Sequence, residues 1–449
     1  MEVLLIWAVQ IFEGGTLLLE RPETTITIAN WAGVNMGDDA IFSSLLSALR
    51  SNIPGKLRIF VLSDNEREID RKYKIDGVAP IFEYYRPENL PRVLGFLRRS
   101  DLVIYGGGDL LNGDLTSLSF LRMAKLLGVP VVCCGVGVLP VKNPVQRALA
   151  QSALNSLDLI TLRDLDSMKR LEELGVTGVP TRLTADLAFL LLPKLHGDHL
   201  TAVEGDNGAS ITVGINVRSQ DPMYRFYSQW DEDGFLDTMI STCNRLIEEL
   251  DAHILFLPME ACGRGKEYHH QIFDDMLGRR VLDKIDRKDR FSMLEKEYAP
   301  DELKGLLGQL DLLIAMRLHT LLIASDQGIP MIAFDYAPKL RSFMSSIGRE
   351  EYLIPTEDLD VSTIMTAVRK AMSDQDWKNR EKVRALCLRS QENIRLIIDV
   401  LKEERKSKRR FFAFLPLVPA FVISNYALDI AHGIRDLIRG EGPTGRWPH

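Results

Sequence analysis

The chain contains 449 residues, of which 46% are hydrophobic and 26% are charged, with 55 Lys and Arg against 62 Asp and Glu. This length exceeds what one hydrophobic core usually serves, so we expect two domains. The slightly acidic balance argues against a general nucleic-acid-binding surface, and no nucleic-acid partner is expected. The five cysteines show no CxxC spacing and no disulfide framework, which favours a reducing, cytoplasmic location.

The N-terminal part of the chain predicts one α/β domain. Residues 1–23 are apolar but lack a basic n-region and a cleavage site, so they are predicted to be an extension and not a signal peptide. From residue 24, short β-branched runs alternate with helical patterns. The expected strands are TTITIAN, LRIFVLS, DLVIYGGG, VPVVCCGVGV and DLITLRD. This alternation predicts a parallel, doubly wound sheet, and residues 24–195 are assigned to a Rossmann-like domain.

The pattern restarts after a polar, glycine-bearing stretch at 196–210, which is predicted to be a linker. Further strands are expected at ITVGINVRS, HILFLPM, near RVLD, and at DLLIAMR and PMIAFDY, so residues 211–375 form a second Rossmann-like domain. One helical stretch from about residue 361 to 404 follows, and its part at 376–404 is expected to cross back over the first domain. Two α/β halves joined by a linker predict the glycosyltransferase-B-type architecture.

The tail at 405–449 differs in composition from the rest of the chain. A cationic run precedes FFAFLPLVPAFVI, thirteen apolar residues interrupted by Pro416 and Pro419. A hydrocarbon core of about 30 Å needs roughly 20 helical residues, so this segment is too short to span it. Two interpretations stay open. In the first, residues 405–439 lie in the headgroup plane at the inner face of a membrane. In the second, they pack on the protein as an ordinary hydrophobic tail.

Two glycine-containing loops follow strands of the first domain. In open α/β sheets, ligands bind outside the carboxyl ends of the strands, where glycine lets the backbone approach a ligand. The alternative for the first loop is a tight turn capped by an aspartate. Neither loop has GxGxxG spacing, so no nicotinamide cofactor is implied. The candidate binding residues of these loops are Gly33, Asn35, Gly37, Asp38, Gly107 and Gly108.

Three arginines and one histidine are expected where strands end and helices begin, and Arg317 and His319 are expected to face the interdomain cleft. Arg163 and Arg218 each have two interpretations, a solvated arginine or an anion ligand. Arg317 and His319 form a sharper pair, because a permanently charged guanidinium is almost never buried unpaired. An arginine that holds an anion and a histidine that moves a proton suit an anionic substrate. Asp186 lines the cleft or has only a structural role.

No metal cluster is visible in the sequence. His269 and His270 are adjacent and therefore point in different directions on a helix, and His253 begins a strand. No metal and no cofactor are expected.

Several segments resemble the successive motifs of the polysaccharide pyruvyl transferase family. They are NWAGVNMGDDAI, YGGGDLLNG, LITLRDLDSMKRLEELGV, LTADLAFLL, VGINVRS and AMRLHTLLIASDQGIPMIAFDYAPKLRSFMSSIG, in the family's order over about residues 25–350. The last block is the most specific, with Arg-x-His, Gly-x-Pro and Tyr-x-x-Lys supplied by Arg317, His319, Gly328, Pro330, Tyr336 and Lys339. Residues 1–23, the segment EACGRGKEYHH and the tail depart from the family pattern.

The resemblance implies a transferase that moves the enolpyruvyl unit of phosphoenolpyruvate onto sugar hydroxyls, often as a pyruvate ketal, and releases phosphate. The implied acceptor is a cell-surface polysaccharide or its lipid-linked precursor. His319 would then be the acid–base residue, while Arg317, Lys339, Arg163 and Arg218 would hold the anionic donor. The alternative is a nucleotide-sugar-dependent glycosyltransferase that uses Asp335 or Glu267 on the ribose. A membrane-docked scaffold without turnover is a third possibility.

Overall fold

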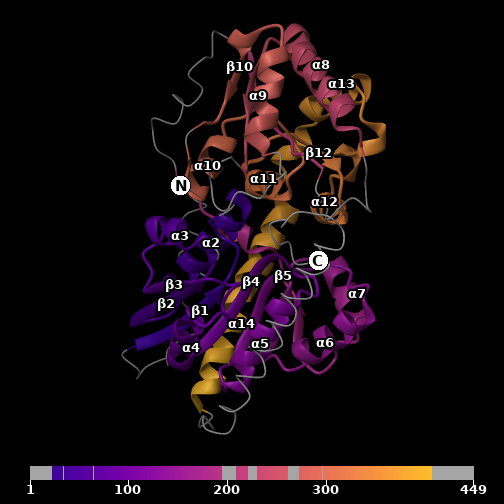
Figure 1. Cartoon of the computed structure of the whole chain (residues 1–449). Helices are drawn as coiled ribbons and strands as arrows, with labels where there is room; N and C mark the ends of the chain where they lie inside the picture. Colours follow the sequence, from indigo (N-terminus) through magenta and orange to yellow (C-terminus); the bar gives the residue numbers. More distant parts are fainter. Residues whose placement is uncertain are drawn as a thin grey trace, which may run out of the picture.

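The computed structural model describes residues 23–33, 35–63, 65–194, 209–220, 230–260, 273–295 and 297–406. The predictions for the N-terminal extension, for most of the linker and for the tail lie outside these residues. The described chain forms two parallel sheets with helices between successive strands, as Figure 1 shows. The predicted fold class, two Rossmann-like doubly wound domains, is therefore confirmed.

The first sheet has seven parallel strands in the order β3-β2-β1-β4-β5-β6-β7. Its strands are β1 (Glu23–Ala29), β2 (Lys56–Leu62), β3 (Gly77–Ala79), β4 (Leu102–Leu111), β5 (Val131–Val138), β6 (Leu159–Leu162) and β7 (Thr181–Leu183). Its helices are α2 (Met36–Asn52), α3 (Glu66–Lys72), α4 (Leu90–Arg99), α5 (Leu115–Leu126), α6 (Pro144–Leu154) and α7 (Leu165–Glu173). Strand β5 is buried along its whole length, as expected for a central parallel strand covered on both faces.

The second sheet has six strands in the order β10-β9-β8-β11-β12-β13. They are β8 (Ile211–Asn216), β9 (Ala252–Phe256), β10 (Phe291–Met293), β11 (Leu312–Ala315), β12 (Met331–Asp335) and β13 (Leu353–Pro355). The helices before the C-terminal region are α8 (Glu232–Leu250), α9 (Asp274–Lys284), α10 (Pro300–Leu307), α11 (Leu318–Ala324) and α12 (Pro338–Ser346). In both sheets the first strand in the sequence is central, so the polypeptide winds outward in two directions.

Two expectations about this half of the chain are wrong. The strand expected near residues 280–283 is the end of α9, because Leu277, Val281 and Ile285 recur at helical spacing and are all buried. The single helix expected over 361–404 is two helices, α13 (Val361–Ser373) and α14 (Glu381–Lys406). They are separated where Asp374 caps a short 3-10 turn and Trp377 packs on Tyr352, with ring centroids 5.0 Å apart.

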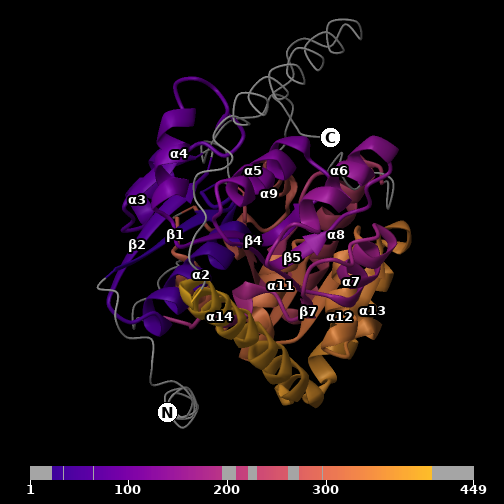
Figure 2. The ribbon, with the colours of Figure 1, turned by 90° about the horizontal axis from the view of Figure 1, so that it is seen from below.

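Helix α14 leaves the second domain and packs against the first. Its 26 residues span about 39 Å at 1.5 Å per residue. It contacts α2, β5 and the short 3-10 helix η1 (Leu187–Leu190), and Figures 1 and 2 show it lying along the first domain. None of the helices in the described ranges is long and apolar enough to cross a membrane.

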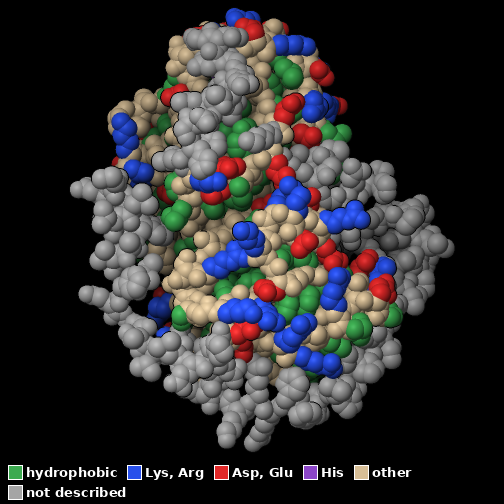
Figure 3. Space-filling model, turned by 90° about the vertical axis from the view of Figure 1, so that its left-hand side faces the viewer, with side chains coloured by type: hydrophobic (Ala, Val, Ile, Leu, Met, Phe, Trp, Pro, Cys, Tyr) green, Lys and Arg blue, Asp and Glu red, His purple; other side chains and the backbone are tan. Residues whose placement is uncertain are grey.

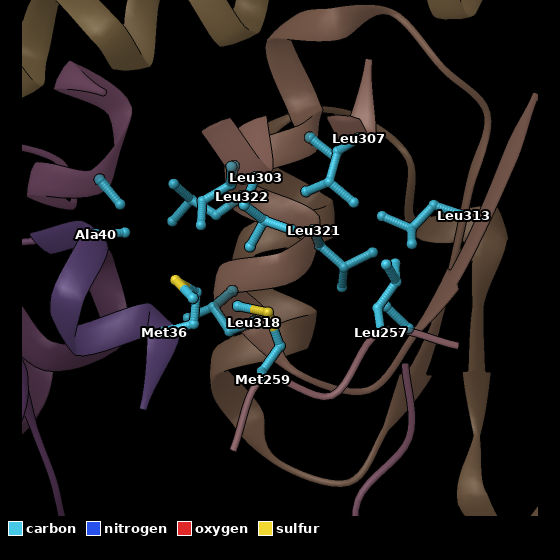
Figure 4. Packing of buried hydrophobic residues seen from close by; sticks show 14 of the residues in the cluster. Met36, Ala40, Leu257, Met259, Leu303, Leu307, Leu313, Leu318, Leu321 and Leu322 are labelled. Carbon is cyan, nitrogen blue, oxygen red and sulfur yellow. The ribbon is translucent and has the colours of Figure 1, made fainter. Parts of the chain in front are cut away.

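A continuous apolar contact joins the two domains. Met36 and Ala40 of α2 face Leu318 and Leu322 of α11, as Figure 4 shows. The backbone N–H of Met36 also donates to the carbonyl oxygen of Met259 across the interface, at 2.9 Å. The start of α2 is therefore fixed against the C-terminal edge of the second sheet.

Charged contacts between the domains lie at the outer end of this interface. Arg71 and Lys72 of α3 form ion pairs with Glu297 of the second domain at 2.7 and 2.6 Å. On the face shown in Figure 3, Lys and Arg side chains are interspersed with Asp and Glu. Among the described residues, that face therefore presents mixed charge.

Candidate active site

The start of α2 forms the first-domain part of the candidate site. Asn35 caps the helix, and its side-chain oxygen accepts a hydrogen bond from the N–H of Asp38 at 3.0 Å. Burial raises the pKa of the half-buried Asp38 to about 6, although the charge of His319 and the Asn35 hydrogen bond act in the opposite direction. Asp38 therefore changes its ionisation near neutral pH.

His319 lies on α11 of the second domain, but its side chain contacts the first domain. Its ring packs directly on Gly37, so closely that a Cβ atom at position 37 would lie 2.4 Å from Nδ1. Its Nε2 lies 3.5 Å from Oδ2 of Asp186. The position of His319 thus depends on how the two domains fit together.

Asp186 is buried, and it begins the 3-10 helix η1. Its Oδ1 accepts a hydrogen bond from the N–H of Ala188 at 3.0 Å, while its Oδ2 faces both His319 and Nη1 of Arg163, the latter at 3.4 Å. Burial opposes ionisation of Asp186, but His319 and Arg163 outweigh it and hold the pKa of this carboxyl below its ordinary value. Asp186 therefore caps η1 and also faces the contact between the two domains.

Arg317 is surrounded by carboxylates of its own domain. Its guanidinium donates two hydrogen bonds to Asp274, at 2.6 and 2.7 Å, and one to Glu260 at 2.7 Å. Asp274 and Glu260 raise the pKa of Arg317 above its ordinary value, although burial alone would lower it. Because these contacts use Nε and Nη2 and neutralise the charge of the guanidinium, Arg317 is organised as an internal ion-pair centre.

A second group of cations lies around Tyr336, which follows β12. Arg218 donates from Nη1 to the Tyr336 hydroxyl at 3.4 Å, and its Cζ lies 5.4 Å from the ring centroid. Lys339 Nζ lies 5.8 Å from the same centroid. Burial alone would raise the pKa of Tyr336, but Lys339, Arg218 and Arg317 outweigh it and lower it. Arg218 and Lys339 therefore place two cations around the ring of Tyr336.

The other predicted loop glycines serve packing. Gly107 has a φ of +78°, and a Cβ atom there would overlap Ile41 of α2 at 2.0 Å. Gly33, with a φ of +92°, turns the chain beside Asn65, whose side-chain amide donates to its carbonyl. Gly108 lies closer to the candidate site, because its Cβ position is 3.3 Å from Oδ1 of Asp38.

The structure brings together Gly37, Asp38, His319, Asp186 and Arg163, whereas Arg218 and Lys339 form a separate group with Tyr336. Within the described ranges, no group of three or more His, Cys, Asp or Glu residues could hold a metal ion. Asp335, one residue considered for a nucleotide ribose, is paired with Arg341. Glu267, His269 and His270 lie outside the described residues.

Glu260 and Asp274 were not anticipated from the sequence. Asp274 begins α9 as an ordinary acidic residue of a helix first turn, and only its complete burial reveals its role. No local spacing connects it to Arg317, because the contact depends on the tertiary fold.

Two Rossmann-like domains with a site between the C-terminal edges of their sheets define a protein of the glycosyltransferase-B type. The chain resembles a UDP-GlcNAc 2-epimerase from Neisseria meningitidis, with a TM-score of 0.58, 11% identity, and coverage of 85% of this chain and 100% of that chain. It also resembles a putative UDP-N-acetylglucosamine 2-epimerase from Listeria monocytogenes, with a TM-score of 0.57, 12% identity, and coverage of 88% and 100%. At such low identity, these likenesses establish the fold alone.

The sequence itself is more specific. Residues 35–338 match the family described as polysaccharide pyruvyl transferase. The chain is also 25% identical over 324 residues to the amylovoran biosynthesis protein AmsJ of Erwinia amylovora, covering 70% of this chain and 76% of that protein. The chain belongs to the polysaccharide pyruvyl transferase family, which confirms the resemblance seen in the motifs.

The contact between Gly37 and His319 gives a first prediction. Gly37→Ala should lower kcat by about 10²-fold, because the added methyl group displaces the imidazole by roughly an ångström. Alanine has a higher helix propensity than glycine, so the change in helix propensity should not lower the free energy of unfolding. Steady-state kinetics and urea unfolding of the same preparation would measure both quantities.

Gly95→Ala is the matched control for this prediction. Gly95 is also helical, but its Cβ position meets only Nη2 of Arg99 at an ordinary 3.5 Å. We expect activity equal to that of the parent protein and equal or higher stability. Full activity of Gly37→Ala would contradict the placement of His319.

The ion pairs of Arg317 give a second prediction. Arg317→Ala should lower the free energy of unfolding by about 3–5 kcal/mol, because it leaves two buried carboxylates uncompensated. Arg71→Ala removes the exposed ion pairs with Glu68 and Glu297 and should leave stability close to that of the parent. Urea unfolding would compare the two, and equal stability of both variants would show that Arg317 is not an internal ion-pair centre.

Proposed function

We propose that this protein transfers the pyruvyl unit of phosphoenolpyruvate onto hydroxyls of a glycan acceptor. The observation that carries the proposal is the interdomain contact of His319 with Gly37 and Asp186, in a chain that belongs to the pyruvyl transferase family. This contact assembles a group able to give and take a proton beside a cation-lined sheet edge. The reaction needs both features.

The steps of pyruvyl transfer define which groups the site needs. Protonation of C3 of phosphoenolpyruvate makes C2 electrophilic, an acceptor hydroxyl oxygen bonds to C2, and the bond from C2 to the phosphate oxygen breaks. Attack by a second hydroxyl closes a ketal. Of the two hydroxyl protons lost overall, one balances the proton gained by C3 and the other leaves on phosphate. A site for this reaction requires an acid near C3, a base near the hydroxyl, and cations for the donor.

We assign the acid to His319 and the base to Asp38. Asp38 is half-buried with its pKa raised to about 6, so at neutral pH it is ionised while remaining a usable proton acceptor. Arg218 and Lys339 would hold the carboxylate and phosphate of the donor, with Arg163 acting through Asp186. Arg317 would orient the chain around His319 and take no direct part in binding.

The family and the named relative support a glycan acceptor. A role in polysaccharide biosynthesis fits a cell-surface glycan or its lipid-linked precursor. Peripheral membrane contact through 405–439 and a cytoplasmic location remain predictions, because the tail lies outside the described residues. No cofactor enters the proposed reaction.

The test is phosphate release from phosphoenolpyruvate by the purified protein, with and without a crude lipid-linked oligosaccharide extract. Release should require the extract, and His319→Ala should lose about 10²–10⁴-fold of the rate, because a positioned acid–base group typically contributes that much. Gly95→Ala controls for handling of the variants. Full turnover by His319→Ala would refute its role, and turnover only with nucleotide sugars would replace pyruvyl transfer by glycosyl transfer.

The ionisation of Asp38 predicts a pH dependence. A base must be deprotonated, so kcat/KM for the acceptor should rise as the pH increases through about 6, the value to which burial raises the pKa of Asp38. Asp38→Asn should be slower and should lose this acid limb. The exposed Asp70→Asn should keep the parent profile, whereas an unchanged limb in Asp38→Asn would assign the base elsewhere.

A further inference from the structure

Helix α14 carries two buried polar residues on an otherwise apolar face. Leu386, Ile394, Ile397 and Leu401 pack into the core, as expected for a helix crossing a domain. Ser390 lies among them, and both it and Asn393 are 0% exposed. Apolar side chains would provide packing without the cost of burying polar groups, so the two polar residues need another explanation.

Asn393 uses both ends of its side-chain amide. Its Nδ2 donates to the carbonyl oxygens of Ala185 and Ser390, at 3.0 and 3.1 Å. Its Oδ1 accepts hydrogen bonds from the hydroxyls of Thr161, at the end of the first sheet, and Thr184, the latter at 2.8 Å. A buried network with its groups paired in this way holds one arrangement of the backbone.

This arrangement fixes the residue beside the candidate acid. The hydroxyl of Ser390 donates to the backbone carbonyl of Asp186 at 2.8 Å. Helix α14 therefore holds the segment 184–186 at the hydroxyl of Thr184 and at the carbonyls of Ala185 and Asp186. Oδ2 of Asp186, which also accepts a hydrogen bond from Arg163, then lies 3.5 Å from Nε2 of His319.

We propose that Ser390 and Asn393 of α14 are positioning residues for catalysis, holding Asp186 so that its carboxylate orients the imidazole of His319. The inference rests on the proposed function only for the role of His319 in turnover. The family match ends at residue 338, so α14 is an active-site component beyond the matched region. The second domain supplies His319, and helix α14, which packs on the first domain, fixes Asp186 beside it.

An orienting carboxylate matters because the two nitrogens of a neutral imidazole are not equivalent. A carboxylate at Nε2 selects the tautomer with the proton on that nitrogen and stabilises the imidazolium. Without it, the ring is free to present the wrong nitrogen to the substrate. Loss of the α14 contacts should therefore act on kcat, with little change in KM, since no substrate contact is removed.

The experiment uses the full chain with ¹⁵N-labelled histidine. The ¹⁵N chemical shifts of the His319 ring report its tautomer and protonation without any substrate, and His319→Ala identifies the signals. We expect Asp186→Asn and Ser390→Ala to move these signals in the same direction. Leu401→Ala is the matched control, because it truncates a buried residue of α14 two turns beyond the network. It should lower stability and leave the ring signals in place.

Kinetics complete the test. Ser390→Ala should lower kcat for phosphate release by about 10- to 100-fold with KM within about twofold, the size of effect seen when a partner that orients a metal-ligating histidine is removed. Asn393→Leu should reproduce the effect, whereas Leu401→Ala should not. Parent-like ring signals in Ser390→Ala and Asn393→Leu would overturn the inference. Shifted signals without any turnover of phosphoenolpyruvate would instead refute the proposed function and leave the positioning role intact.

Discussion

The second-domain side of the site depends on the burial of one guanidinium with two carboxylates. Arg317 follows β11, and its partner Asp274 begins α9 and is completely buried. Such a charge is tolerated inside a protein only if its partners and their remaining hydrogen bonds are well placed. Asp274 also accepts from the N–H of Met259 at 3.1 Å, while Asn216 accepts from the N–H of Arg317 at the same distance. The C-terminal ends of β8, β9 and β11 are thereby connected through Asp274, Asn216 and Arg317.

This ion-pair centre also helps to position the first domain. The carbonyl of Met259, on the segment that Asp274 holds, accepts the first free N–H of α2 from Met36. The helix then presents Gly37 to the ring of His319, which stands two residues after Arg317. The sequence Arg-x-His thus couples a structural ion pair to the imidazole of His319 through the backbone at the start of one short helix. The arginine fixes where the histidine can be.

The parts of this arrangement that could be predicted are those with a local signal. Long apolar runs such as β5 indicated central strands, and strand ends followed by polar residues indicated the cleft edge where Arg317 and His319 lie. The edge strands β3 and β7 have only three residues each, too few to form a detectable apolar run. Val281 and Leu282 in α9 suggested a strand because two adjacent apolar residues fit both the helical and the strand period. The contact of Asp186 with His319 joins two domains, so no spacing in the sequence could indicate it.

The charges of the site are segregated in a way that suits proton transfer next to anion binding. Asp38 and Asp186 act on His319, whereas Arg218 and Lys339 gather around Tyr336 on the second sheet. A trianionic donor placed beside the carboxylates would be repelled, and a histidine placed among the cations would resist protonation. In the proposed reaction, separation of the two groups, with the charge of Arg317 neutralised by Asp274 and Glu260, would let one cleft hold an anion and still supply a proton. The cost is that the acid must be oriented from the opposite domain, which is the task that Asp186 and the returning helix α14 can perform.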